Sequence, residues 1–568
     1  GISVEMLRRG KLLSNVCASS ATVADAASNF SNLISLEVPE ARTVFLKPST
    51  SPRRKPSVYI PHNIDSIPAD VVAVNPADLG GAIPTFRIAS PTCDYYALRI
   101  PLLKAGFRRV PDDAVVFSSN IVWGKSAPVA VSSPRWEHYV PRNAYQKFNH
   151  FPRSHKHLGD KRGMAQSLRQ WDESVANTFT PQTLFYPAEK EAIEKLMTNG
   201  APGKRYIWKP SRGSCGRGIM ISRSGAEDNS WRLIMKEIDY KASDTTAPDM
   251  ARIPYMSYVV QEYIENPLIV DGRKLDLRLY VGVTSFDPLT VYLHNEGLVR
   301  FAAEAYANNS PPSSLAAAPG SNSDMRFKHL TNYSLGRKLE ADQHGSLDLK
   351  WPLNKFRTRL DEIYGADHAS LSYTALMAKA KRVIVETLLA AKSNISAATK
   401  RQNVGNGGDN YVELFGFDIM FDDSGNAWLI EVNTLPSLES SSTMDYHVKS
   451  AVTTDLLNMG QLELFRRPAS AFETCGVIPP METADPNVLR RLGDLLHSES
   501  GLCHEGASSD MTIPSSSNSL FELQMKLYDE HRYRGGFERI FPSSKHPLVP
   551  HHMQTLSPLD LAAAQFTL

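Results

Sequence analysis

Residues 413–433 form the segment that most constrains the fold of this chain. Their sequence, ELFGFDIMFDDSGNAWLIEVN, consists of two apolar runs around the turn residues 424–425, which predicts a β-hairpin. Asp418 and Glu431 lie equally far from that turn, so the hairpin places them opposite each other, with β-carbons about 5 Å apart. Asn433 follows two residues later on the same face.

This convergence of two carboxylates and an amide predicts a magnesium site. Carboxylates held together on an apolar sheet repel each other and lose hydration unless a cation neutralises them. Sites with few carboxylates, completed by phosphate oxygens, suit Mg²⁺, so we expect Asp418, Glu431 and Asn433 to hold magnesium beside a nucleotide. The alternative is an ordinary amphipathic hairpin whose polar side chains face solvent.

Two further segments carry charged side chains in patterns that suit a phosphate site. Residues 209–219 (KPSRGSCGRGI) follow an expected strand and place three glycines within six positions, so backbone N–H groups can surround phosphates while Lys209 adds positive charge. The lysine precedes the glycines, unlike in a P-loop, and a flexible turn with a surface lysine is the alternative. Lys274, Asp276 and Arg278 alternate with leucines and therefore share one face of a strand, which is either a solvated edge or part of the same site.

The composition is that of a globular protein and restricts the classes of partner. The chain has 568 residues, of which 42% are hydrophobic, enough for two or three domains. Its 62 basic and 60 acidic residues leave a net charge of +2, which argues against nucleic-acid binding over the whole surface. The five cysteines include no Cys-x-x-Cys pair, which speaks against a zinc ribbon or disulfide framework and favours a reducing, intracellular compartment. Because no apolar run approaches about 18 residues, we expect no membrane span.

Changes in composition and in apolar periodicity along the chain predict its division into domains. The expected parts are a flexible leader (1–57), a smaller N-terminal α/β domain (58–199), a ligand-binding core (200–460) and a partly disordered C-terminal extension (461–568). An apolar-periodic segment without Pro or Gly predicts a long helix at 370–391. Segments rich in Ser, Pro, Ala or Gly predict mobile loops at 308–323 and 394–410.

Seven motifs, taken in order, resemble those of the tubulin tyrosine ligase-like family. They are KPSRGSCGRGI at 209–219, QEYI at 261–264, KLDLR at 274–278, EGLVRF at 296–301, HLTNYS at 329–334, ELFGFD at 413–418 and LIEVN at 429–433. The ordered set covers about residues 90–460 and is far more specific than any one motif. Further similarity, to the polyglutamylase branch, lies in NHFP at 149–152, Asp287-Pro288 with Tyr292, PSLESSS at 436–442 with Asp445, and DLLN at 455–458.

The resemblance implies an ATP-grasp fold, in which ATP lies between two α/β lobes, and it implies roles for individual positions. Contacts with ATP are implied for Lys209, Cys215, Gly216, Gln261, Glu262, Tyr263, Ile264, Lys274, Asp276, Thr331 and Asn332. Magnesium binding is implied for Asp418, Glu431 and Asn433, and binding of the incoming amino acid for Arg300, Ser334 and, by a looser alignment, Lys350. Cys215 and Glu262 depart from the residues usual in the family, which indicates backbone contacts at both positions.

The implied activity is that of an ATP-dependent glutamate ligase. ATP phosphorylates a side-chain carboxylate of a tubulin tail, and the amino group of free glutamate displaces phosphate from the acyl phosphate to form an isopeptide bond. Such a reaction depends on positioning and charge neutralisation, here chiefly by Lys209, Arg300 and Glu431. A glycine or tyrosine ligase of the same family would share the ATP and metal residues, and a non-catalytic microtubule-binding relative is a further alternative.

The basic stretch 147–162 carries one acid among many cations and histidines. Acidic tails of tubulin or microtubules could dock there by electrostatic steering, or the stretch could be a solvated loop and helix start. No nucleic-acid partner is expected, because aromatic residues do not interleave with the charges, and no membrane partner. The resemblance implies a cytoplasmic, cytoskeletal location, including the cilium or flagellum and basal body, and nothing requires more than a monomer.

Overall fold

The computed structural model describes residues 43–51, 54–110, 119–125, 145–213, 216–246, 252–306, 331, 349–365, 368–402, 410–465, 515–543, 552 and 555–565. Predicted features outside these residues are Cys215, Asn332, Ser334 and the loop at 308–323. The helices are α2 (Tyr96–Lys104), α3 (Lys161–Ala176), α4 (Lys190–Asn199), α5 (Ser230–Ser243), α9 (Leu353–Tyr364), α10 (Tyr373–Gln402), α11 (Thr443–Met459), α14 (Ser515–Arg532) and α15 (Pro558–Gln565), with a π-helix η6 (His155–Gly159).

Within the described ranges the strands form four sheets, which together with the helices confirm the predicted mixed α/β class. Strands are given below in their spatial order within each sheet. The first sheet is β2 (Ser57–Tyr59), β1 (Val44–Lys47), β3 (Val72–Val74). The second is β5 (Arg108–Arg109), β4 (Thr85–Ile88), β6 (Ile121–Trp123), β7 (Lys147–Phe148). The third is β10 (Met220–Arg223), β9 (Arg205–Pro210), β11 (Tyr258–Glu262), β8 (Thr183–Tyr186). The fourth is β15 (Lys350–Pro352), β14 (Leu289–Phe301), β13 (Arg273–Phe286), β16 (Glu413–Phe421), β17 (Ala427–Asn433), with β12 (Ile269–Val270) on β13 and β18 (Phe537–Phe541) on β14.

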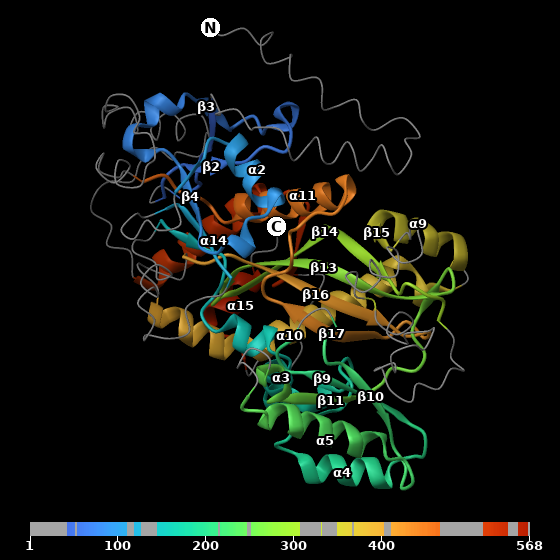
Figure 1. Cartoon of the computed structure of the whole chain (residues 1–568). Helices are drawn as coiled ribbons and strands as arrows, with labels where there is room; N and C mark the ends of the chain where they lie inside the picture. The colour runs from blue at the N-terminus through green and yellow to red at the C-terminus, as the bar shows by residue number, and fades with distance from the viewer. Residues whose placement is uncertain are drawn as a thin grey trace.

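The fourth sheet is the centre of the large lobe, and helices cover both of its faces. Successive side chains of a strand point to opposite faces, so Leu277 and Leu279 of β13 join the apolar cluster that contains α10, whereas Tyr280 joins the cluster that contains α11. Figure 1 shows α10 and α11 on opposite sides of this sheet. The sheet is therefore a rigid platform buried on both faces.

Helix α10 confirms the predicted helix but extends beyond it to Gln402. The expectation of a loop from residue 394 is wrong for residues 394–402, because Ile395, Ala398 and Thr399 continue the buried stripe of the helix at the i, i+3, i+4 spacing. The remaining residues of that loop, 403–409, lie outside the described residues. Among the described residues, no helix is long and apolar enough to cross a bilayer.

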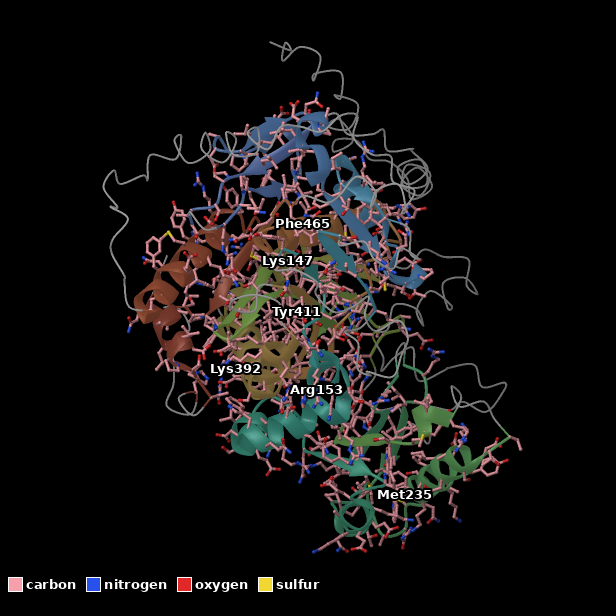
Figure 2. The ribbon with its side chains drawn as sticks, turned by 90° about the vertical axis from the view of Figure 1, so that its left-hand side faces the viewer. Lys147, Arg153, Met235, Lys392, Tyr411 and Phe465 are labelled. Atoms are coloured by element: carbon pink, nitrogen blue, oxygen red, sulfur yellow. The ribbon has the colours of Figure 1, made fainter. Side chains whose placement is uncertain are left out.

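The third sheet and the helices α4 and α5 form a smaller lobe at one end of the molecule. Figure 2 shows Met235 of α5 in this lobe, apart from Lys392 and Tyr411 in the large lobe. The expected boundary at residue 199 differs from the structure, because β8 pairs with β11 and thus belongs to the small lobe. Two α/β lobes built on separate sheets are the arrangement of an ATP-grasp fold.

Both ends of the described chain join the large lobe. Residues 44–47 were expected in a flexible leader, but they form β1, in which Val44 and Leu46 are buried. The C-terminal extension also contributes an element of the core, because β18 pairs with β14 and buries Ile540 and Phe541. Strand β18 has no local sequence signal, since its partner strand is far away in the chain. Strand β1 pairs with the nearby β2 and β3, and it joins the large lobe through the apolar cluster that also contains α11.

Candidate active site

A cleft between the small lobe and the fourth sheet brings most of the predicted site residues together. It opens to solvent, and its empty space, including the open part, is about 990 Å³. The predicted residues that line it are Lys209, Gly216, Gln261, Glu262, Tyr263, Ile264, Lys274, Asp276, Arg300, Thr331, Asp418 and Glu431. Asn433 and Lys350 are the described site residues that lie outside this lining.

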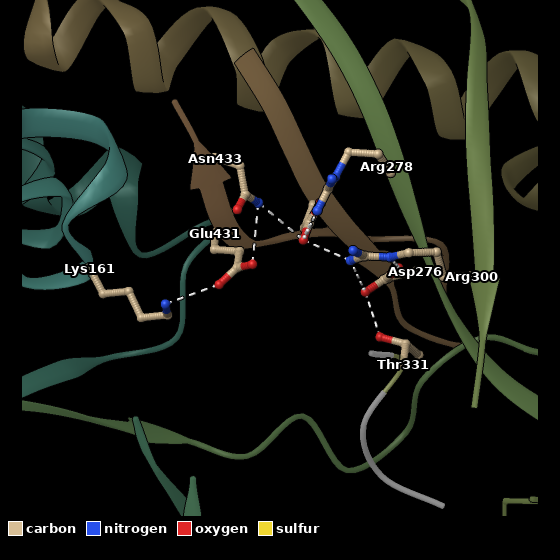
Figure 3. Close-up of polar contacts among 8 residues, drawn as sticks. Lys161, Asp276, Arg278, Arg300, Thr331, Glu431 and Asn433 are labelled. Carbon is tan, nitrogen blue, oxygen red and sulfur yellow. Dashed lines mark hydrogen bonds and ion pairs between the residues drawn. The ribbon is translucent and has the colours of Figure 1, made fainter. Parts of the chain in front are cut away.

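The predicted pairing of Asp418 with Glu431 is confirmed. The two residues are direct partners across β16 and β17, next to a bulge between Asp418 and Ile419. Asn433 donates from Nδ2 to Glu431 Oε1 at 3.2 Å and to Asp418 Oδ2 at 3.5 Å, so the three side chains converge (Figure 3). Because Asp418 is only 1% exposed, the alternative of a hairpin with solvated polar residues is excluded at this position.

Two arginines neutralise Asp418 from the neighbouring strands. Arg278 donates to it from Nε and Nη2, at 2.5 and 3.1 Å, and Arg300 donates from Nη2 at 2.7 Å. Arg300 also forms two bonds of 2.7 Å with Asp276, which accepts a third from Thr331 Oγ1 at 2.5 Å. Burial opposes the charge of Arg300, but the two carboxylates raise its pKa well above the usual value. Asp276 and Arg278 are thus part of a buried network and not of a solvated edge.

Arg300 was expected to receive the carboxylate of an amino acid. In this structure three of its hydrogen bonds go to Asp276 and Asp418. A guanidinium has five N–H donors, so binding a further carboxylate is compatible with these bonds. The network fixes the orientation of the planar group, which is what bidentate recognition requires.

Lys161 is a site residue that the sequence analysis did not assign to the cleft. Its Nζ lies 3.0 Å from Glu431 Oε2 and donates to the carbonyl of Gly213 at 3.3 Å. It begins α3, where Asp160 accepts from the N–H of Gly163 as the N-cap. Burial disfavours ionisation of Glu431, but Lys161 and the two arginines outweigh burial and hold its pKa well below the usual range. A cation therefore already faces this carboxylate.

Lys209 and Lys274 present buried ammonium groups to the cleft. Lys209 Nζ donates to Gln261 Oε1 at 2.9 Å, and Lys274 Nζ to the Tyr263 hydroxyl at 3.2 Å. Burial lowers the pKa of each lysine to about 8. In the part of the chain that the structure describes, neither forms an ion pair with a carboxylate, so both suit an anionic ligand. The alternative of a flexible turn with a surface lysine is excluded for Lys209.

Glu262, which departs from the residue usual in the family, pairs with a nearby lysine. Its carboxylate forms an ion pair with Lys204 Nζ at 2.7 Å, and both side chains are partly exposed. An exposed pair of this kind contributes little to stability. It does turn the charge of Glu262 toward Lys204, which is consistent with the expected backbone contact at this position.

Lys350, whose predicted role came from the looser alignment, lies next to Arg300. The register of β14 and β15 makes the two residues direct partners. The ammonium of Lys350 contacts Asp445 Oδ2 at 3.0 Å, and burial lowers its pKa to about 8 although Asp445 opposes the decrease. The amino-acid end of the predicted site thus contains two adjacent cations.

The basic stretch 147–162 is not a continuous exposed strip. Lys147 is buried inside the large lobe (Figure 2), and His150 is buried with its Nδ1 2.9 Å from Glu413 Oε1. Arg153 and Lys156 are exposed. Any docking of an acidic segment is therefore limited to the middle of the stretch.

Comparison with known proteins agrees with this geometry. The sequence profile of the Tubulin-tyrosine ligase family matches residues 138–469. The chain is 28% identical over 446 residues to Tubulin monoglutamylase TTLL4 of Homo sapiens, covering 72% of this chain and 32% of that protein. It is 30% identical over 423 residues to Tubulin polyglutamylase TTLL5 of Mus musculus (70% and 28%) and 30% identical over 347 residues to Probable tubulin polyglutamylase TTLL9 of Rattus norvegicus (56% and 68%).

The chain spans about a third of the length of the first two relatives. The matched segment contains the small lobe, strands β12 to β17 of the fourth sheet and every described residue of the cleft. The profile covers more than half of the chain, so the family assignment does not depend on the modest identity to any one relative. The chain belongs to the tubulin-tyrosine ligase family.

Proposed function

We propose that this chain is an ATP-dependent ligase that joins glutamate to side-chain carboxylates of tubulin tails. The observation that carries the proposal is the meeting of two buried lysines with Asp418 and Glu431 in one cleft, where Asn433 is hydrogen-bonded to both carboxylates. The names of the relatives, which are tubulin glutamylases, support tubulin as substrate and glutamate as the added group.

The cleft suits ATP in both charge and shape. Apolar side chains from both lobes, Ile207 and Ile219 on one side and Met420 and Leu429 on the other, line it and suit an adenine ring. Lys209 and Lys274 would face the phosphates, together with backbone N–H groups of the loop around Gly216. A polyphosphate would supply the negative charge that these lysines lack among the described residues.

The donor set of Asp418, Glu431 and Asn433 fits magnesium. Two carboxylates and an amide oxygen are hard ligands, and rotation of the Asn433 amide would present its oxygen. Within the described residues, no group of three or more His, Cys, Asp or Glu side chains could hold a metal by itself, so phosphate oxygens would have to complete the coordination. Bound magnesium would neutralise the phosphates during transfer of the γ-phosphoryl group.

The reaction would proceed in two steps. A carboxylate oxygen of the tail attacks the γ-phosphorus and ADP leaves, which forms an acyl phosphate. The amino group of glutamate then attacks the acyl carbon, loses a proton and expels inorganic phosphate. The chain would contribute orientation by Arg300 and charge neutralisation by Lys209 and Lys161, and no serine or cysteine nucleophile is needed.

Incorporation of labelled amino acids tests the proposal. The full chain is incubated with ATP, Mg²⁺, tubulin and labelled glutamate, glycine or tyrosine, and the tubulin tails are analysed by mass spectrometry. We expect ATP-dependent addition of glutamate alone. Addition of glycine or tyrosine in its place would assign the chain to another activity of the family, and binding to microtubules without any incorporation would identify a non-catalytic relative. We expect the active species to be a monomer associated with the cytoskeleton.

A further inference from the structure

A row of three hydrogen-bonded side chains crosses the sheet of the small lobe and ends at the ammonium group of Lys209. Lys209 lies on β9, Gln261 on β11 and Thr183 on β8, which are adjacent strands. Thr183 is the direct partner of Gln261, and Lys209 is the partner of Val259, two residues before Gln261. Because residues two apart on a strand share a face, the three side chains lie on the same face of the sheet.

The direction of these hydrogen bonds is set at the Thr183 end of the row. The Thr183 hydroxyl donates its one proton to the carbonyl of Pro181 at 2.8 Å, so it can meet Gln261 only as an acceptor. The amide nitrogen Nε2 of Gln261 donates to it at 2.9 Å. This leaves the amide oxygen Oε1 to accept from Lys209 Nζ, also at 2.9 Å. A reversed amide would direct N–H groups at the ammonium group, and both of its hydrogen bonds would be lost.

Lys209 depends on such an acceptor because its surroundings disfavour its charge. Its side chain is only 8% exposed. Burial and, next in size, the charge of Lys161 lower its pKa to about 8, and Lys274 acts in the same direction while Glu431 opposes them. A hydrogen bond from the ammonium group to an amide oxygen favours the charged form. The orientation of the Gln261 amide therefore affects both the position and the charge of this lysine.

Thr183 is itself held by a helix of the large lobe. Its carbonyl accepts a hydrogen bond from Arg169 Nη2, and Arg169 also donates from Nη1 to Glu189 Oε1 at 2.8 Å. Arg169 belongs to α3, whose Met164 and Leu168 join the apolar cluster of the large lobe. The Thr183 end of the row is thus fixed by contacts with both lobes.

We propose that Thr183 is a positioning residue whose hydroxyl orients the Gln261 amide and thereby holds the Lys209 ammonium group in place for an anionic ligand of the cleft. Thr183 lies outside the lining of the cleft, so its effect is exerted through Gln261. The identification of the ligand as the phosphates of ATP rests on the proposed function. The orientation of the amide and of the lysine is a property of the ligand-free chain.

The isosteric variant Thr183→Val tests the role of the hydroxyl, because valine keeps the branched shape that suits a strand. We expect the Kd for ATP at pH 7, measured by calorimetric titration, to rise about fivefold to tenfold, as for the loss of one hydrogen bond. Thr183→Ser should restore the affinity. Thr178→Val is the matched control, since this exposed threonine of the same connection donates to the carbonyl of Val175, and it should change the Kd less than twofold.

Combination with Gln261→Met separates positioning from a general effect on the strand. If Thr183 acts through Gln261, Thr183→Val should change the Kd less than twofold in a chain that already carries Gln261→Met. Loosening of β8 would weaken binding by the same factor in both chains, and that result would overturn the proposal. Folding is checked by circular dichroism and thermal unfolding, and Thr183→Ala takes the place of Thr183→Val if the latter does not fold.

Titration of Lys209 in the ligand-free chain separates this inference from the proposed function. The rate at which Lys209 is acetylated at a series of pH values, measured by mass spectrometry, gives its pKa. Loss of the oriented oxygen should lower this pKa in Thr183→Val and raise the neutral fraction at pH 7 about threefold. If the unmodified chain binds no ATP, the proposed function is wrong, and this titration still decides the role of Thr183. If the chain binds ATP and Thr183→Val changes neither the Kd nor the pKa, only the assignment of Thr183 is wrong.

Discussion

Asp276 and Arg300 face each other across β13 and β14 and share two hydrogen bonds of 2.7 Å. Arg300 also binds Asp418, and Asn433 connects Asp418 to Glu431. These side chains therefore form one continuous network from Asp276 to Glu431 (Figure 3). Removing a single charge from a buried network leaves its partner unpaired, so isosteric substitutions are the most informative tests.

Glu431→Gln should abolish most of the ligase activity. The substitution keeps the shape of the side chain but removes the charge that would bind magnesium, and we expect the rate to fall at least 100-fold, or about 2.7 kcal/mol in the transition state. Asp423→Asn, an exposed carboxylate in the turn of the same hairpin, is the control and should retain full activity. Rates are measured as labelled glutamate transferred to tubulin, and a Glu431→Gln enzyme with full activity would contradict the proposed metal site.

The affinity for ATP should decrease as the pH rises above about 8. Burial lowers the pKa of Lys209 and Lys274 to about 8, so both ammonium groups are charged below this pH and become neutral above it. The charged forms bind phosphate, and affinity should decrease by up to tenfold per pH unit for each lysine that must take up a proton. Calorimetric titration with ATP between pH 7 and 9.5 measures the effect.

Lys274→Met should bind ATP more weakly at pH 7 and show a shallower dependence on pH, because one of the two titrating groups is gone. Lys236→Met, on the exposed face of α5, should leave both the affinity and its pH dependence unchanged. An affinity that stays constant up to pH 9.5 would show that neither lysine titrates in contact with the phosphates.

Two lysines of the basic stretch should have different effects. Lys161→Met removes the cation that faces Glu431, and we expect the KM for ATP to rise tenfold or more with little change in the KM for tubulin. Lys156→Met removes an exposed charge, and if acidic tails dock there it should raise the KM for tubulin by a few-fold, an effect that weakens at high salt. Steady-state kinetics with each substrate varied in turn distinguishes the two roles, and identical effects of both variants would contradict them.

Strand β18 should be essential for the stability of the large lobe. Ile540 is fully buried against the fourth sheet, and Ile540→Ala should lower the free energy of unfolding by about 2–5 kcal/mol. Leu520→Ala on the exposed side of α14 is the control and should change it by about 0.5 kcal/mol or less. Urea unfolding measures both, and a cost below about 1 kcal/mol for Ile540→Ala would mean that this strand contributes little to the core.

The sequence was sufficient where a local pattern fixes geometry. The position of the turn predicted a hairpin with Asp418 opposite Glu431, and the structure has this pair. The pairs nearer the turn, such as Phe421 with Ala427, are offset by one residue, and the bulge between Asp418 and Ile419 restores the predicted register. The apolar period of 370–391 likewise predicted α10, although the polar residues after it concealed the last buried turn. The mixed α/β class followed from the same patterns.

Only the tertiary structure decided which distant residues complete the site. Lys161 reaches Glu431 across 270 positions of sequence, and Lys350 lies opposite Arg300 because of the register of a short strand that follows a long connection. The contact of β1 with α11, where Lys47 donates to the Asn458 carbonyl, and the pairing of β18 with β14 are equally non-local. Such contacts depend on the packing of whole elements against one another, which side-chain periodicity within a single segment does not encode.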